Sequence, residues 1–438
     1  MEAREFQRRR KRLMDMMGDD TIAIVPTSPV RIRNRDVEYP FRHDSDFYYL
    51  TGFVEPESVA VLIPGRPSGE FILFCRERDA LMETWNGLRA GLEGAVEKHG
   101  ADDAFPIEDL DDILPGLLGD QERIFYTMGN DPGFDQRVVS WVKHVRDQAR
   151  SGISAPDEFI SLNHILHDMR LYKSRQEVKA MRHAARISAA AHKRAMQACK
   201  PGMFEYQIEA ELIHEFMQKG ARSSAYTSIV GGGANSCILH YTDNNTELAD
   251  GDVLLIDAGA EYESYASDIT RTFPVNGVFT EAQRQIYEVV LSAQDAAIEA
   301  VQPGNHWNEP HEAAVLAITE GLVSLGILKG RVRTLIKDHA YSKYYMHRTG
   351  HWLGMDVHDV GDYKVDGEWR MLESGMVLTI EPGLYMAPNR GLAKKWWDIG
   401  VRIEDDVLVT KTGYDVLSKD MPKSIEDIEA LMAVGNAA

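Results

Sequence analysis

Apolar residues follow two different patterns along the 438-residue chain. In the first part, three short apolar runs are typical of buried strands: Val59–Ile63, Phe71–Phe74 and Arg123–Tyr126. Between the second and third of these runs, Asp79–Lys98 follows a largely helical pattern that three glycines interrupt. Strands that alternate with helices predict an α/β layer domain.

The pattern changes at Ser174, where a long helical period begins. Ser174 suits an N-cap and Glu177 completes a capping box, so we predict a helix over Ser174–Cys199. Further elements are predicted downstream, with helices at Tyr206–Lys219, Ala282–Val301 and His311–Leu325 and strands at Asp252–Ile256, Ile269–Val275, Met376–Ile380, Val401–Glu404 and Val407–Thr410. Strands mixed with long helices predict an α+β fold. We place the smaller α/β domain at residues 1–172, with a Gly- and Pro-containing connection at Ser151–Glu158, and the α+β domain at residues 173–438.

Composition and charge narrow the class of protein. Hydrophobic residues make up 44% of the chain, but no apolar run approaches the roughly 20 residues that cross a bilayer. The basic segment within Met1–Met17 lacks the apolar region of a signal peptide, so we predict a surface helix with a basic face. Three separated cysteines form neither a disulfide framework nor a zinc spacing, which favours a cytoplasmic location. The net charge of −20 argues against nucleic acid as a partner.

Carboxylates stand at the ends of apolar strands in the second domain. Asp257 follows the apolar run Val253–Ile256, and a charge there is costly unless something neutralises it. Asp268 opens the next strand, so the two carboxylates face each other if the strands form a hairpin. Two facing carboxylates repel unless they share a cation.

Further polar motifs follow towards the C-terminus. His347, His351 and His358 lie within twelve positions of one another. Glu381 ends another apolar strand, immediately before a Pro-Gly turn. In the predicted strand Val401–Glu404, the alternation of side chains places Arg402 and Glu404 on the same face of the strand.

Each motif alone has an ordinary structural explanation, and other catalytic patterns do not fit. His214–Gln218 imitates a zinc-protease helix, but Gln218 occupies the position of the second histidine. The glycines of Gly231–Gly233 match neither a Walker loop nor a dinucleotide-binding loop. No Gly-x-Ser-x-Gly segment provides a serine nucleophile.

Taken in order, Asp, Asp, His, Glu and Glu resemble the site of the pita-bread metallopeptidases, which include methionine aminopeptidase, aminopeptidase P, prolidase and creatinase. The resemblance extends over almost the whole chain and implies a pita-bread catalytic domain behind a creatinase/prolidase-type N-terminal domain. It is closest to aminopeptidase P, because of Arg33–Asp36, Tyr39–Arg42, Ser45–Phe53, Ile238–Tyr241 and Gly350–Gly361.

The resemblance implies two divalent metal ions per chain, Mn²⁺ above all, with Zn²⁺ or Co²⁺ as substitutes. Asp257 would hold one ion, His351 and Glu381 the other, and Asp268 and Glu404 both. A metal-bridging hydroxide would attack the scissile carbonyl, and Glu381 would pass the proton to the leaving nitrogen. The remaining candidates are His240, His347 and His358 for the substrate or the tetrahedral intermediate, Arg402 as partner of a ligand carboxylate, and Tyr385 and Trp85 for the proline pocket, Trp85 by reaching over from the N-terminal domain or a neighbouring subunit.

The predicted activity is removal of the N-terminal residue from peptides whose second residue is proline, by a homodimer or homotetramer. Prolidase, which requires dipeptides, is the main alternative, and the sequence does not separate the two. A metal-free peptide- or protein-binding module on the same fold is the second alternative. The complete set of ligand residues argues against that module.

Overall fold

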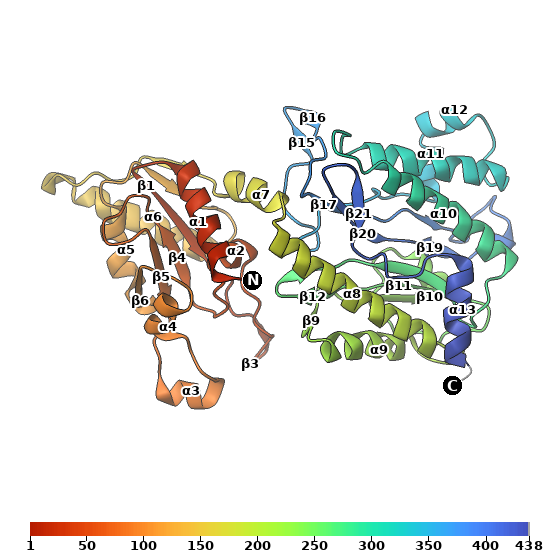
Figure 1. Cartoon of the computed structure of the whole chain (residues 1–438), viewed down its shortest axis with the longest axis horizontal. Helices are drawn as coiled ribbons and strands as arrows, with labels where there is room; N and C mark the ends of the chain where they lie inside the picture. Colours follow the sequence, from red (N-terminus) through yellow and green to blue (C-terminus); the bar gives the residue numbers. More distant parts are fainter. Residues whose placement is uncertain (437–438) are drawn as a thin grey trace. The chain divides into compact units, whose positions relative to one another are not determined.

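The computed structural model describes residues 1–436 of the chain and divides into two compact units, Met1–Met169 and Arg170–Ala438. This division lies a few residues before the domain boundary predicted at 172. In Figure 1 the first unit is coloured from red to yellow and the second from yellow-green to blue. Helix α7 (Asn163–Leu171) spans the division.

The first unit is built on a six-stranded sheet in the order β6-β5-β4-β1-β7-β8. Strand β4 pairs antiparallel with β1 and β5, whereas the other neighbours are parallel. Apolar side chains of α5 and α6 join those of the sheet in one core. The elements are α1 (Ala3–Met17), β1 (Thr21–Pro26), β2 (Ile32–Asn34), β3 (Val37–Glu38), α2 (Ser45–Thr51), β4 (Val59–Leu62), β5 (Phe71–Cys75), α3 (Ala80–Asn86), α4 (Gly91–Glu97), β6 (Asp103–Pro106), α5 (Leu110–Leu118), β7 (Arg123–Phe125), α6 (Pro132–Asp147) and β8 (Glu158–Ile160).

Two predictions for this unit need correction. The basic face of α1 is not all at the surface, because Arg9 and Arg10 are buried and donate to the carbonyls of Tyr49 and Leu50 at the end of α2. Guanidinium groups satisfy such terminal carbonyls and stack on aromatic rings, and each of these two lies 4.0 Å from a ring centre. The helix predicted at Asp79–Lys98 is two helices, α3 and α4. Gly87 ends α3 with a φ of +91°, a conformation outside the helix.

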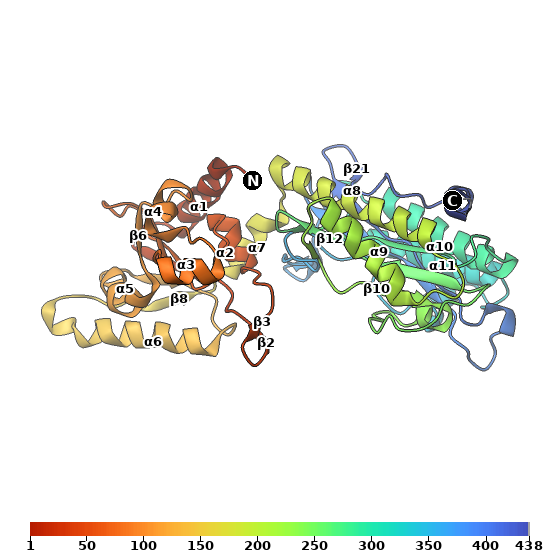
Figure 2. The same cartoon turned by 90° about the horizontal axis from the view of Figure 1, so that it is seen from below.

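The second unit mixes long helices with short antiparallel sheets, as predicted. Helix α8 (Arg175–Ala198) begins at the predicted capping box of Ser174 and Glu177 and packs beside α9 (Glu205–Gln218). Helices α10 (Glu281–Glu299) and α11 (Glu309–Ser324) form a second pair (Figures 1 and 2). The main sheets are β10-β11-β14, β17-β20-β21 and β18-β19, and they share one large core with the helices.

The bounds of these strands are β10 (Ile229–Gly232), β11 (Val253–Asp257), β14 (Thr270–Pro274), β17 (Val377–Ile380), β18 (Gly383–Tyr385), β19 (Gly400–Arg402), β20 (Asp405–Val409) and β21 (Tyr414–Val416). Smaller elements are β9 (Ser223–Ser224), β12 (Ala260–Tyr262), β13 (Tyr265–Ala266), α12 (Val332–Lys337), β15 (Lys364–Val365), β16 (Glu368–Trp369) and α13 (Ile425–Asn436). Among the described residues, none of the helices combines the length and apolar character needed to cross a bilayer.

Candidate metal centre

The two aspartates meet because β11 and β14 run antiparallel. Asp257 in β11 lies opposite Thr270, the first residue of β14, and Asp268 lies just before β14 begins. The segment between the aspartates folds into the small β12–β13 hairpin. The two arms of this hairpin lie so close together that a β-carbon on Gly259 would come within 1.7 Å of the Ser267 carbonyl oxygen. The predicted hairpin therefore brings Asp257 and Asp268 to one end of the sheet.

His351 and Glu381 are brought together by backbone pairing. The amide of Thr379 in β17 donates to the carbonyl of His351 at 2.9 Å, and the amide of Glu381 donates to the carbonyl of Thr349 at 2.7 Å. A β-carbon on Gly350 would lie 1.9 Å from the Thr379 carbonyl oxygen, so only glycine allows this approach. As a result, Nε2 of His351 lies 3.7 Å from Oε1 of Glu381.

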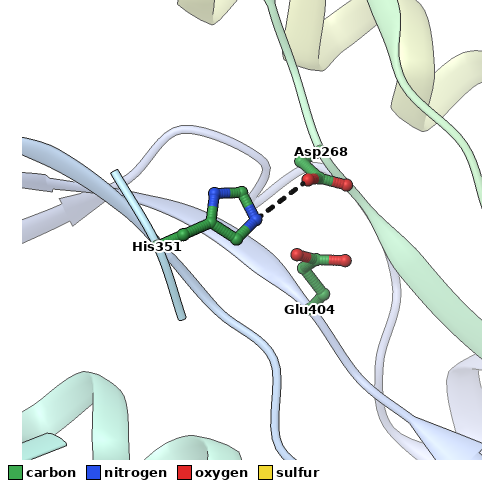
Figure 3. A group of neighbouring side chains, drawn as sticks. All are labelled: Asp268, His351 and Glu404. Carbon is green, nitrogen blue, oxygen red and sulfur yellow. Dashed lines mark ion pairs between the residues drawn. The ribbon is translucent and has the colours of Figure 1, made fainter. Parts of the chain in front are cut away.

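Glu404 reaches the same place from the end of β19. Its amide donates to the carbonyl of Thr270 at 3.1 Å, and its carboxylate accepts from the Thr270 hydroxyl at 2.7 Å. Figure 3 shows the resulting convergence of Glu404 with Asp268 and His351. One ligand atom from each of these three residues lies within 4.8 Å of the other two, close enough for a single metal ion to contact all three.

A single cavity of about 1000 Å³ joins this group to most of the other predicted site residues. Its lining residues all come from the second unit. Nine of the eleven predicted site residues are among them: Asp257, Asp268, His351, Glu381, Glu404, His240, His347, His358 and Arg402.

The imidazole of His351 is oriented for a ligand at Nε2. Its Nδ1 lies 2.9 Å from the carbonyl oxygen of Trp352, which can only accept, so Nδ1 carries a proton. Burial opposes a positive charge on this ring, but Asp268 and Glu381 outweigh burial and raise the pKa of His351 to about 9. The surroundings of Nε2 thus attract positive charge, and a metal ion there can replace the proton.

The electrostatic surroundings of the carboxylates also favour a bound cation. Burial, with the charges of Asp268 and Glu381 added, raises the pKa of Glu404 well above its ordinary value. Burial likewise raises the pKa of Glu381 to about 7, although His351 and Arg402 oppose the shift. Only for Asp268 does the hydrogen bond and charge of His351 outweigh burial and lower the pKa. Three buried carboxylates, the partly exposed Glu381 and one imidazole are a donor set that fits divalent metal ions.

Arg402 lies beside this donor set, as predicted. Its Nη2 donates to Oδ2 of Asp257 at 2.7 Å, and Asp257 is one of the carboxylates predicted to be ligands. Its Nη1 donates to the Tyr385 hydroxyl, which lies 2.8 Å from Nε2 of His347. Because Nδ1 of His347 donates to the carbonyl of Arg348, Nε2 accepts from Tyr385. Burial also lowers the pKa of His347 to about 3, which keeps the ring neutral.

The cavity lining does not include two of the predicted substrate contacts. Tyr385 is buried, with 2% of its surface exposed, and supports Arg402 and His347. Trp85 belongs to α3 of the first unit, where it is 78% exposed.

Tyr226 is a site residue that sequence reasoning missed. Its hydroxyl lies 2.5 Å from Oδ1 of Asp257 and 2.5 Å from Oδ1 of Asp268, so it contacts both aspartates. Tyr226 lies between β9 and β10, and no sequence motif or periodic pattern marks it. It reaches the site through the pairing of strands that are far apart in the sequence. The aromatic wall of the cavity, made by Trp307, Tyr363 and Trp369, was missed for the same reason.

Comparisons with known proteins agree with this architecture. Residues 179–411 match the model of metallopeptidase family M24, and residues 6–126 match the aminopeptidase P N-terminal domain. The chain belongs to metallopeptidase family M24. The match to the M24 model falls in the second unit, so the predicted pita-bread domain and the predicted family are confirmed.

Individual relatives of this M24 protein extend over its whole length. It is 46% identical to Xaa-Pro aminopeptidase of Escherichia coli, over 98% of this chain and 97% of the relative. The solved structure of Pseudomonas aeruginosa aminopeptidase PepP superposes with a TM-score of 0.99 at 58% identity, covering 100% of this chain and 99% of the other. Human Xaa-Pro dipeptidase is 34% identical, over 90% of this chain and 84% of the relative.

Proposed function

We propose that this M24 protein removes the N-terminal residue from peptides whose second residue is proline. The observation that carries the proposal is the convergence of five ligand-type residues with three histidines and Arg402 in one cavity. Similarity to Xaa-Pro aminopeptidases over nearly the full chain supports the same activity.

The donor set favours two divalent ions, and its oxygen-rich composition with one nitrogen suits Mn²⁺. Asp257 is proposed to hold one ion and His351 with Glu381 the other, while Asp268 and Glu404 contact both. When bound, the ions polarise the scissile carbonyl and supply a hydroxide nucleophile near neutral pH. Removing the metals should therefore abolish hydrolysis.

The surrounding residues handle protons and substrate. Glu381 faces the cavity between His347 and His351, and we assign it the transfer of a proton to the leaving proline nitrogen. His240 and His358 are exposed to the cavity and are assigned hydrogen bonds to the substrate or to the developing oxyanion. The free amine of the first residue should matter, because the site is proposed to accept only chain ends.

Assembly into a homodimer or homotetramer in the cytoplasm is part of the proposal. Helix α3 buries none of its residues, and it exposes Leu81 (68%) and Trp85 (78%), with Leu88 (83%) just beyond its end. Such an apolar patch fits contact with a second copy of the chain. Within that assembly Trp85 is proposed to reach a partner's proline pocket.

A panel of four peptides tests the activity. We expect Xaa-Pro-Yaa to be cleaved after Xaa, Xaa-Ala-Yaa far more slowly, and N-acetyl-Xaa-Pro-Yaa negligibly. Equal cleavage rates for the alanine and proline peptides would refute the proline specificity. Rapid cleavage of the acetylated peptide would refute the aminopeptidase assignment. The dipeptide Xaa-Pro tests the prolidase alternative, because a prolidase would prefer this dipeptide to the longer peptides.

A further inference from the structure

The cavity lining contains two arginines, and only one of them has a carboxylate partner. Arg402 pairs with Asp257. Arg348 is exposed and lines the same cavity, yet no carboxylate among the described residues lies within ion-pair distance of it. Because Arg348 faces the cavity without an ion pair to any described residue, its guanidinium is available to a negatively charged group of a ligand.

Two neighbours hold the Arg348 guanidinium in place. One terminal nitrogen donates to the side-chain oxygen of Asn308, and the group lies 5.2 Å from the ring centre of Trp369, which also lines the cavity. A guanidinium has five N–H donors in a rigid fork, and the contact with Asn308 engages one nitrogen. The remaining donors suit a carboxylate, which this fork binds in a bidentate manner.

The proposed reaction fixes the direction in which a short peptide lies in the cavity. The first residue and the scissile bond belong at the proposed metal position, where Asp268 and Glu404 stand. The chain beyond proline then extends away from that position, and its terminus is negative. Arg402 is occupied by Asp257, which leaves Arg348 as the arginine of the lining that is available for this negative group.

We propose that Arg348 binds a substrate carboxylate on the C-terminal side of proline and so favours peptides that carry one there. The inference rests on the proposed aminopeptidase function and adds a specificity-determining residue to it. The carboxylate has two sources, the free terminus of a tripeptide Xaa-Pro-Yaa or an acidic side chain at Yaa.

Matched peptide pairs test the proposal with the metal-loaded, full-length enzyme. Xaa-Pro-Leu is compared with its C-terminal amide, and Xaa-Pro-Glu-amide with Xaa-Pro-Gln-amide. We expect kcat/KM to favour the member with the carboxylate by about tenfold, mainly through KM, because one charged hydrogen-bonded contact away from the reacting bond has that size. The first pair reports on the terminus and the second on the side chain.

Two variants and a control assign the effect. Arg348→Gln should bring the ratio of kcat/KM values within each pair close to one. Arg348→Lys should retain part of the preference, because an ammonium keeps the charge but cannot bind a carboxylate in a bidentate manner. Lys364→Gln is the control, because Lys364 lies 4.4 Å from the same Trp369 ring but outside the cavity lining, and it should keep the wild-type ratio.

Two results would overturn the role of Arg348: ratios near one for both pairs in the wild type, or an equal loss of the ratio in Arg348→Gln and Lys364→Gln. If the protein cleaves none of the peptides, calorimetric titration with the same peptide pairs gives the binding ratio. The proposal about Arg348 is thereby tested even if the protein cleaves none of the peptides, an outcome that would refute the proposed function instead.

Discussion

Glu404 is 1% exposed, and a single described donor, the hydroxyl of Thr270, contacts its carboxylate side chain. A buried carboxylate with one neutral hydrogen bond remains ionised only if positive charge lies close to it. Asp268, also buried, lies close to Glu404, and His351 already supplies positive charge to it through an ion pair at 3.4 Å. The burial of these two side chains is therefore explained by metal binding better than by stability.

Replacing Glu404 with glutamine keeps the size of the side chain and removes its charge. We expect Glu404→Gln to lose metal and activity together, with metal affinity falling more than about a hundredfold, because altering even a residue that only supports a ligand costs 10–100-fold. Elemental analysis and kcat/KM measure the two effects. Glu320→Gln, on the exposed side of α11, is the control and should change neither.

The exposed histidines should behave differently from the ligands. His240 and His358 line the cavity but do not belong to the group of side chains that converge on one metal position. We expect His240→Ala and His358→Ala to lower kcat by about 10²–10³, the usual cost of an active-site hydrogen-bond donor, with metal content unchanged. Metal loss in either variant would move that histidine into the coordination sphere.

The loop that carries His351 and His358 is fixed at its far end by a buried ion cluster. Asp359 accepts from Arg170 at 2.6 Å and from Lys173 at 2.9 Å, and its side chain is 1% exposed. The charges of Lys173 and Arg170 outweigh burial and lower the pKa of Asp359. Backbone pairing with β17 holds the near end of the loop, so both ends are held inside the second unit.

Asp359→Asn tests the strength of this anchor. It leaves two buried cations without their shared carboxylate, so we expect a loss of about 3–5 kcal/mol in the free energy of unfolding. Asp356→Asn is the matched control, because Asp356 also pairs with Arg170 but its side chain is 41% exposed, and about 1 kcal/mol or less is expected. Urea unfolding measures both, and equal losses would show that burial of the pair is not what matters.

Elements defined by local patterns were predictable from the sequence. The capping box of Ser174 and Glu177 begins α8 where predicted, because both of its hydrogen bonds lie within one helical turn. The burial of Arg9 and Arg10 was not predictable, since it depends on carbonyls and rings some 40 or more residues away along the chain. The break at Gly87 was signalled by the glycine, but periodicity alone does not say whether a helix continues through one.

For the molecule as a whole, chain order carried more information than any single motif. Asp257, Asp268, His351, Glu381 and Glu404 could be assembled from their order, and the family that this order indicated is confirmed. Tyr226 could not be found this way, because a tyrosine in a loop acquires its role only through the fold. Subunit number, metal identity and the role of Trp85 stay predictions.

Buried histidines give the second unit a pH dependence of stability that does not involve the substrate. Burial lowers the pKa of His192 to about 4, and it lowers the pKa of His311 to about 4 as well. An unfolded histidine titrates near 6.5, so between about pH 4 and 6.5 the unfolded chain binds more protons than the folded one. Stability from these groups is therefore fully present above about pH 6.5 and is lost as the pH falls towards 4.

His192→Gln should remove one such contribution. His192 is fully buried and donates from Nε2 to the carbonyl of Ala258, so the variant will be less stable at neutral pH, but its stability should fall less steeply in acid. We expect the slopes of wild type and variant to differ by up to about 1.4 kcal/mol per pH unit between pH 4.5 and 6. The site carboxylates are present in both proteins, so the difference between metal-free wild type and metal-free variant isolates the histidine. Urea unfolding across this range measures it, with exposed His214→Gln as the control, and parallel curves for His192→Gln and wild type would contradict the expected role of burial.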